Sequence, residues 1–217
     1  MTVRMINAGE VLEAVSGIGL EVSESQAGQL SAFANLLLRW NRAYNLTRIE
    51  KPEDVLSLHI ADSLTLVKAF PEISPAAAVV VDAGSGGGLP GIPLAVMRTD
   101  LSVTMVDSVR KKVLFLRQAV LETGLANASA LHARVETLSI QADVVTSRAF
   151  AALPLMVELT KGLLRPEGRW VAMKGKVPED EIRDLPPYAE VEKIMPLRIP
   201  GTAVERHLIV LKHRRSG

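Results

Sequence analysis

The sequence predicts an α/β fold in which a helical extension precedes a mostly parallel sheet. From residue 76 onward, short β-branched runs alternate with segments of helical period, which is typical of a parallel sheet covered by helices on both faces. The last two apolar runs are joined by a short turn, and this favours an antiparallel hairpin at the end of the sheet. We therefore expect a helical extension, residues 1–75, packed on the core of one compact α/β domain, residues 76–217.

The composition fits a single cytoplasmic protein of this kind. Of its 217 residues, 48% are apolar, which is enough for a substantial core. The absence of Cys excludes disulfides, thiolate zinc sites and Cys nucleophiles, and the 4 His residues form no metal-binding pattern, so we expect no metal. Glu10 and Glu13 interrupt the first apolar segment, which is therefore no secretory signal. No apolar run reaches the roughly 18 residues of a membrane span, so we expect no membrane contact.

Helical periodicity predicts three helices in the extension. Asn7 is a typical N-cap for the first, which stops before the glycine at position 19. Ser23 caps the second, whose apolar positions run at helical spacing as far as Tyr44. The third, residues 51–70, carries Pro52 in its first turn, where the fixed φ of proline suits a helix start.

Strands and helices alternate through the domain itself. In order, the predicted elements are the strand 77–82, the helix 91–99, the strand 102–107, the helix 109–124, the strands 128–133 and 142–150, the helix 153–168, the strand 169–175, and the hairpin strands 188–200 and 205–213. In such sheets, ligands bind at the carboxyl ends of the strands, near the point where the strand order reverses.

The stretch "VVVDAGSGGGLPG", residues 79–91, is a strand followed by a glycine-rich loop at that position. A nucleoside triphosphate loop would continue with Lys after its last glycine, but Ile92 follows Gly91. The spacing G-x-G-x-x-G, residues 86–91, does match a dinucleotide site. Two observations argue against a pyrophosphate here. Asp82 would repel it, and the two prolines of the loop region lack the amide N–H groups that would bind it.

S-adenosylmethionine suits the loop better, because it carries a positive sulfonium and a zwitterionic tail and has no phosphate. Gly84 and Gly86 have no Cβ, so the backbone can approach such a ligand closely. Asp107 ends the next strand, close to the spacing of about 20 residues expected for a carboxylate that binds ribose hydroxyls. A dinucleotide would use the same carboxylate, so Asp107 does not separate the two ligands.

Several segments carry a resemblance that extends roughly from residue 31 to residue 212. They read "LLLRWNRAYNLTRIEKPEDVLSLHIADSL", "VDAGSGGGLPGIPLAV", "VDSVRKKVLFLRQ", "VVTSRAF", "MKGKVPEDEI" and "ERHLIVLKH". Together they resemble the bacterial RsmG (GidB) family, whose members methylate N7 of a guanine in 16S ribosomal RNA. The resemblance implies a class I methyltransferase-like Rossmann sheet, S-adenosyl-L-methionine as cofactor, and 16S ribosomal RNA or the small ribosomal subunit as partner. We expect a monomer.

The same resemblance implies roles for particular residues. Gly84 and Leu89 are expected to contact the cofactor, Val135 and Glu136 to flank its adenine, and Arg148 to lie beside the methyl donor and the guanine. One departure from the family pattern is the middle glycine of residues 86–88, where a bulkier residue is more usual; it loosens the loop without abolishing binding.

Transfer to guanine N7 needs little chemical assistance from the protein. This nitrogen has an exposed lone pair and no proton to lose, so the reaction needs positioning and no general base. Methylation at carbon 5 of pyrimidines is excluded by the absence of Cys. The segment "DLPPY", residues 184–188, resembles the tetrad of amine methyltransferases, but it follows the fifth strand in a charged segment and is interpreted as a turn.

Arg148 is the predicted catalytic residue, because the fourth strand ends at "SRAF". An arginine fork can bond guanine O6, a phosphate or a carboxylate, and Phe150 offers a ring that can stack a base. The methylated guanine is cationic, so Arg148 is expected to place the substrate or the cofactor's carboxylate. The other interpretation is a surface arginine at a strand end.

His59, Asp62 and Ser63 lie at i, i+3 and i+4 of the third predicted helix and share a face. That face either lines the cofactor pocket or forms an internal network that joins the extension to the sheet.

Basic residues near the predicted pocket mouth are candidates for RNA contacts that depend on salt concentration. These candidates are His59, Arg110, Lys111, Arg134, Lys174 and Arg206.

Trp40 and Tyr44, four residues apart, are expected to pack in the core, and Asn41 and Asn45 to bond the following loop.

Two functions besides an RNA methyltransferase remain open on the residues alone. The first is an NAD-dependent oxidoreductase, since the glycine spacing permits a dinucleotide. The second is a non-catalytic RNA-binding or assembly protein that retains the pocket.

Overall fold

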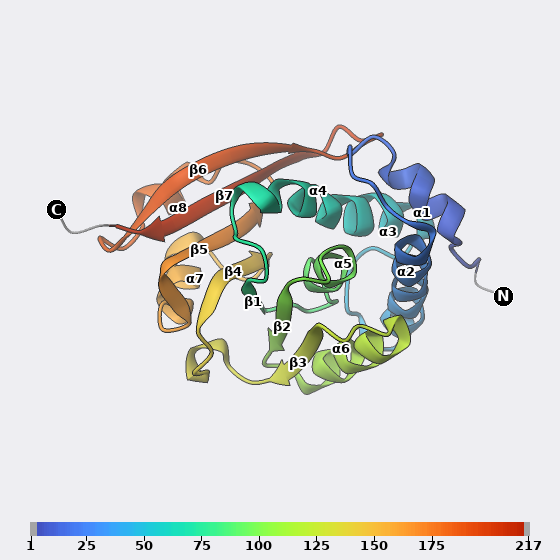
Figure 1. Ribbon diagram of the computed structural model, residues 1–217, viewed down its shortest axis with the longest axis horizontal. Helices are drawn as coiled ribbons and strands as arrows, with labels where there is room; N and C mark the ends of the chain where they lie inside the picture. Colours follow the sequence, from blue (N-terminus) through green and yellow to red (C-terminus); the bar gives the residue numbers. More distant parts are fainter. Residues whose placement is uncertain (1–3, 215–217) are drawn as a thin grey trace.

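The computed structural model describes residues 4–214 and shows one seven-stranded sheet between two layers of helices (Figure 1). The strands are β1 (Val79–Ala83), β2 (Ser102–Asp107), β3 (Ala128–His132), β4 (Ala142–Arg148), β5 (Leu164–Lys174), β6 (Ala189–Arg198) and β7 (Glu205–His213). Their order is β3-β2-β1-β4-β5-β7-β6. The first five are parallel, and β7 is antiparallel to both of its neighbours, which confirms the predicted parallel sheet with its C-terminal hairpin.

The strand order reverses at β1, because the chain proceeds from β1 to β2 on one side and later returns to β4 on the other. Ligands of open α/β sheets bind outside the carboxyl ends of the strands at such a point. The glycine-rich stretch follows β1, and Arg148 is the last residue of β4. Both sequence features therefore meet at one edge of the sheet.

The larger layer covers one face of the sheet and contains the N-terminal helices. It comprises α1 (Ala8–Val15), α2 (Glu24–Tyr44), α3 (Pro52–Val55), the π-helix η1 (Leu56–Ala61), α4 (Asp62–Ala69), the 3-10 helix η2 (Phe70–Glu72), α5 (Gly91–Met97) and α6 (Arg110–Thr123). One apolar core joins these helices to the sheet. The predicted caps Asn7 and Ser23 both form capping boxes, with Glu10 and Gln26.

A smaller layer covers the opposite face. It consists of the 3-10 helix η3 (Val135–Thr137), α7 (Leu153–Thr160) and α8 (Glu179–Arg183). Trp170 of β5 is fully buried in this second core, and its indole N–H donates to Thr160 Oγ1 at 2.9 Å. The hairpin of β6 and β7 extends past α4 toward α1, where Pro200 packs against Gly17 (Figure 1).

The predicted helix 153–168 is wrong in its second half. It ends at Thr160, and β5 already begins at Leu164, which pairs with Ala142 of β4. Gly168 permits this close pairing, because a Cβ there would lie 2.9 Å from the carbonyl oxygen of Asp143. Apolar periodicity in a short segment does not distinguish a buried strand from a helix, and the pairing with β4 decides in favour of the strand.

The predicted helix 51–70 is continuous but not uniform. Its middle third, η1, is a π-helix between α3 and α4, and after α4 the helix ends in the 3-10 turn η2 at Glu72. π-helical turns are rare and occur often at functional sites. His59 lies in this turn, at the edge of the sheet where Arg148 ends β4.

Candidate active site

Two adjoining pockets open at the carboxyl ends of the strands. The first has a volume of ≈ 630 Å³ and the second of ≈ 340 Å³. Gly84, Lys112 and Ala149 line both, so the two form one continuous depression. Such a pair can hold two ligand parts that meet at Gly84.

The glycine loop, residues 84–90, is held mainly by backbone hydrogen bonds. The N–H groups of Gly84 and Ser85 both donate to the carbonyl of Val106 in β2, at 2.9 and 3.1 Å. Gly88 (φ +78°) lies so close to α2 and α6 that a Cβ would meet Ile92 at 3.0 Å and side chains of both helices within 3.3 Å. The N-terminal extension therefore supports the loop from behind.

Gly84 has no room for a side chain. Its φ is +68°, and a Cβ would lie 2.3 Å from Cδ2 of Phe150. The ring of Phe150, which the sequence suggested as a stacking surface for a base, thus covers Gly84 and lines the second pocket. It does not line the first pocket, where Arg148 lies.

Two carboxylates tie the glycine loop to its neighbours. Asp107 accepts the N–H of Gly86 at 3.1 Å and that of Val109 at 2.8 Å, and it lines the second pocket. Asp82 is fully buried beneath the loop and accepts the N–H of Gly91 at 3.0 Å. Burial raises the pKa of Asp82 to about 6. Both acids lie where an anionic ligand would be repelled.

The remaining walls of the second pocket come from the loops after β2 and β3. Val135 and Glu136 lie in η3, and Arg134, just before it, is ion-paired with Glu136 at 2.6 Å. Leu89, by contrast, is buried at the wall of the first pocket. All residues expected at the cofactor therefore line one or the other pocket.

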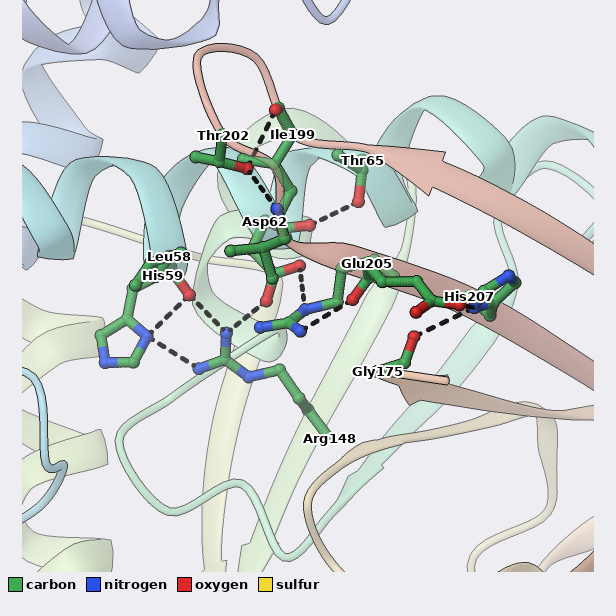
Figure 2. Close-up of polar contacts among 12 residues, drawn as sticks. Leu58, His59, Asp62, Thr65, Arg148, Gly175, Ile199, Thr202, Glu205 and His207 are labelled. Atoms are coloured by element: carbon green, nitrogen blue, oxygen red, sulfur yellow. Dashed lines mark hydrogen bonds and ion pairs between the residues drawn. The ribbon is translucent and has the colours of Figure 1, made fainter. Parts of the chain in front are cut away.

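Arg148 is no free surface arginine. Its guanidinium donates from Nη1 to Asp62 Oδ2 at 3.0 Å and to the carbonyl of Leu58 at 3.2 Å, and from Nη2 to Nδ1 of His59 at 3.1 Å (Figure 2). All three partners lie in or directly after the π-helix η1. The wide turn thus presents a main-chain carbonyl and two side chains to one guanidinium.

Asp62 is fully buried and lies between two arginines. Its Oδ2 accepts from Arg148, and its Oδ1 accepts from Nε of Arg206 in β7 at 3.1 Å. We call His59, Asp62, Arg148 and Arg206 the arginine cluster. A buried carboxylate that satisfies two guanidinium groups leaves one net positive charge at the wall of the first pocket.

His59 is neutral in this cluster. Burial, followed by the nearby charge of Arg148, lowers its pKa to about 4. Its ring is held at both nitrogens: Nδ1 lies 3.1 Å from Nη2 of Arg148 and 3.0 Å from the carbonyl oxygen of Leu58. Nε2 is hydrogen-bonded to Thr47 Oγ1 at 2.8 Å, and the N–H of Thr47 donates to Asn41 Oδ1 at 2.7 Å. The loop after α2 is thereby connected to Arg148.

The structure brings together some predicted residues and leaves others apart. His59 and Asp62 join Arg148, whereas the buried hydroxyl of Ser63 has no partner within residues 4–214. Arg110 and Lys111 lie exposed on the first turn of α6 and line neither pocket. The His59 face lines the first pocket and also joins the extension to β4 through Arg148.

Lys174 is fixed by a residue that the sequence analysis missed. It lines the first pocket and donates to Glu181 of α8 at 2.8 Å. Glu181 also accepts the N–H of Leu153 at 2.6 Å, so it holds the segment between β4 and α7. The acidic run after Pro178 is a helix-start signal of the kind seen at Pro52, and it could have identified α8.

The described part of the chain contains no cluster of three or more potential metal ligands. No helix among the described residues is long and apolar enough to cross a membrane.

Comparisons with known proteins agree with this geometry. A family model described as rRNA small subunit methyltransferase G matches residues 26–209. The chain is 45% identical, over 92% of its length and 95% of the relative, to "Ribosomal RNA small subunit methyltransferase G" of Neisseria meningitidis serogroup A. It is 44% identical to the protein of the same name from Azoarcus sp. (strain BH72), over 97% of this chain and 99% of that protein.

Solved structures with low sequence identity show the same fold. An S-adenosylmethionine-dependent methyltransferase from Aquifex aeolicus aligns with a TM-score of 0.57 at 15% identity, covering 77% of this chain and 96% of that one. Ribosomal protein L11 methylase from Lactobacillus delbrueckii subsp. bulgaricus aligns with a TM-score of 0.53 at 11% identity, over 77% and 81% of the two chains. The class I methyltransferase fold expected from the sequence is thereby confirmed.

Proposed function

This chain belongs to the rRNA small subunit methyltransferase G family, a family of S-adenosylmethionine-dependent enzymes, and on that premise we propose that it methylates N7 of one guanine in 16S ribosomal RNA. The observation that carries the proposal is the pair of pockets joined at Gly84, with Arg148 fixed in the wall of the first. One pocket suits the nucleoside part of the cofactor, and the other has room for its methionine part and an RNA base.

The second pocket fits the nucleoside part of S-adenosylmethionine. Asp107 retains lone pairs for ribose hydroxyls, and Val135 and Glu136 provide the wall against which an adenine would lie. Gly86 leaves space for close approach of the ligand to the backbone, since a Cβ there would meet only the carbonyl oxygen of Gly84, at 3.8 Å. The bound cofactor supplies an activated methyl group on a sulfonium, and buried Asp82 beneath the loop favours that positive charge.

Arg148 acts as a placement group. Three of its hydrogen bonds go to Leu58, His59 and Asp62, and both hydrogens of Nη1 are used by two of them. A guanidinium has five N–H donors, so Nε and one hydrogen of Nη2 remain for a ligand. These two N–H groups suit the cofactor's carboxylate or the O6 edge of a guanine. The hydrogen bonds to Leu58, His59 and Asp62 fix the direction in which the guanidinium of Arg148 points.

The cluster contains no group that acts as a general base. His59 is neutral, but its Nδ1 contacts Arg148 and Leu58 and its Nε2 contacts Thr47, and both oxygens of Asp62 are occupied by arginines. Guanine N7 needs no deprotonation, so catalysis by positioning alone agrees with this arrangement. The single net positive charge of the arginine cluster, with Arg206 at the same wall, favours the RNA backbone, whereas Lys174 is neutralised by Glu181.

The alternatives left open by the sequence fit less well. A dinucleotide would bring its pyrophosphate to a loop that lies above Asp82 and beside Asp107. Family membership also favours an enzyme over a non-catalytic RNA-binding protein. We further propose a cytoplasmic monomer that acts on 16S ribosomal RNA or on the small subunit.

Mass spectrometry of nucleosides tests the reaction directly. Ribosomal RNA or small subunits that lack the modification are treated with the protein and S-adenosylmethionine, and we expect 7-methylguanosine as product. Arg148→Ala is expected to abolish transfer while the fold is retained, because the placement group is lost. Wild-type turnover by Arg148→Ala would refute the role of Arg148, and methylation at any other position would refute the proposed product.

A further inference from the structure

An exposed aromatic pair lies at the end of α2. Tyr44, the last residue of the helix, is 41% exposed, so its expected packing in the core is wrong. Its ring lies 5.0 Å from that of Trp40, with 32° between the planes. Trp40 packs edge-on against the fully buried Phe115 of α6, at 5.7 Å. Tyr44 is therefore an exposed ring on a fixed support.

The ring lines a separate depression between α2 and α6, and the chain leads from it directly to the first pocket. Asn45 ends α2 in a left-handed conformation (φ 49°), and the chain turns directly into the loop 46–49, which lines that pocket. Asn41, one turn before Tyr44, accepts the N–H of Thr47 and donates to the carbonyl of Ile49 at 3.3 Å. The ring and the pocket wall thus form one rigid unit.

Exposed, unpaired cations lie on the segments that carry and support the ring. Arg42 and Arg48 flank Tyr44 in the chain, are exposed, and have no ion pair within the described residues. Lys111, on the first turn of the helix that supports Trp40, is also exposed and unpaired in the described part. Arg39 differs, because it is bound to Glu122 at 2.6 Å. An aromatic ring among free cations suits single-stranded nucleic acid.

We propose that the Trp40–Tyr44 surface stacks an unpaired base that neighbours the target guanine, while Arg42 and Arg48 contact the adjoining phosphates. The inference rests on the proposed function. A guanine that enters the first pocket must leave its stack, and its neighbour then loses a stacking partner. Tyr44, just before the loop 46–49 that lines this pocket, replaces that partner. The surface thus contributes to RNA affinity and to the choice of site.

Substitution of the ring tests this role. Tyr44→Leu removes the aromatic face but keeps an apolar side chain, whereas Tyr44→Phe keeps the face. We expect Tyr44→Leu to raise the KM for RNA about tenfold, with unchanged Kd for S-adenosylmethionine and unchanged kcat at saturating RNA. Tyr44→Phe should behave as wild type. Tyr188→Leu, the same change in the segment between α8 and β6, is the matched control and should leave the KM unchanged.

Fluorescence supplies a direct readout, because the protein has 2 Trp residues and Trp170 is fully buried. Addition of unmodified 16S ribosomal RNA should quench Trp40, and Trp40→Phe should remove the response. Wild-type KM for Tyr44→Leu on an RNA that the wild-type protein does methylate would overturn the inference and leave the proposed function intact. A KM effect seen with small subunits but absent with naked RNA would also overturn it, since the surface would then bind a ribosomal protein.

Discussion

The glycine loop and the arginine cluster face the same depression, but they are held in different ways. The loop is fixed by backbone N–H groups, whose partners Val106, Asp107 and Asp82 lie within about one strand–helix unit of it in the chain. The cluster is fixed by side chains, and its bonds join residues that are 86 and 144 positions apart. The loop therefore depends on two nearby carboxylates and a main-chain carbonyl, whereas the cluster depends on side chains from distant parts of the chain.

The largest effect is expected in the cluster, on replacement of Asp62. Asp62→Asn leaves two partly buried arginines without a counter-charge, and breaking a buried pair in this way costs about 3–5 kcal/mol of unfolding free energy. Methyl transfer should be lost as well, because Arg148 loses an anchor. Urea denaturation and an RNA methylation assay measure the two effects.

A surface ion pair provides the control for this comparison. Glu122→Gln breaks the exposed pair with Arg39 and should cost at most about 1 kcal/mol. A similar loss of stability in both variants would show that the cluster is not specially dependent on its carboxylate.

The second prediction concerns the glycine loop. It separates the loss of stability caused by a steric clash from the loss caused by a left-handed backbone conformation. Gly84 and Gly124 have nearly the same φ, +68° and +67°, but only Gly84 has a neighbour in the way, the ring of Phe150. Gly124→Ala should therefore cost about 1–2 kcal/mol, the strain of the left-handed backbone. Gly84→Ala should cost more and also abolish binding of S-adenosylmethionine, measured by calorimetry.

A double variant tests the contribution of the ring. Gly84→Ala combined with Phe150→Ala should recover the steric part of the stability loss and keep the backbone part. If Gly84→Ala alone bound the cofactor normally, close approach to Gly84 would not be a feature of the site.

The smallest effect is expected in the pH dependence of stability, to which His59 of the cluster and Asp82 beneath the loop contribute with opposite signs. The pKa of His59 is lowered to about 4 from 6.5, so its stabilising contribution is present above pH 6.5 and is lost as pH falls toward 4. The pKa of Asp82 is raised to about 6 from 3.8, so its contribution is present below pH 3.8 and is lost as pH rises through 6.

Variants of the two groups should separate these slopes. Between pH 4.5 and 6.5, Asp82→Asn should lose stability more steeply than wild type on acidification, and His59→Gln less steeply. Denaturation curves at several pH values measure both. If the stability of wild type, Asp82→Asn and His59→Gln changed equally with pH, the opposite contributions of His59 and Asp82 would be contradicted.

The difference between the two regions also explains what the sequence predicts. The strands, the caps and the glycine loop depend on residues near one another in the chain, and these predictions are confirmed. The start of β5 at Leu164 depends on pairing with Ala142, and the exposure of Tyr44 depends on how α2 lies on α6, so periodicity misassigned both.

Arg148, His59 and Asp62 were each identified as candidates, but their mutual contacts were not. Nothing local indicates that the third helix contains a π-turn or that Arg206 shares Asp62 with Arg148. Thr47 and Glu181, which fix the pocket wall through long-range bonds, were missed for the same reason.

The π-turn at residues 56–61 makes the site sensitive to the number of residues in a helix as well as to their kind. Each residue of an α-helix turns the chain by about 100°. Deletion of a single residue from η1 would restore an ordinary helix and rotate its N-terminal part, with His59 and the Leu58 carbonyl, away from Arg148, while Asp62 stayed in place. In this helix, chain length is therefore constrained as tightly as residue identity, and insertions and deletions should be excluded from it even where substitutions are accepted.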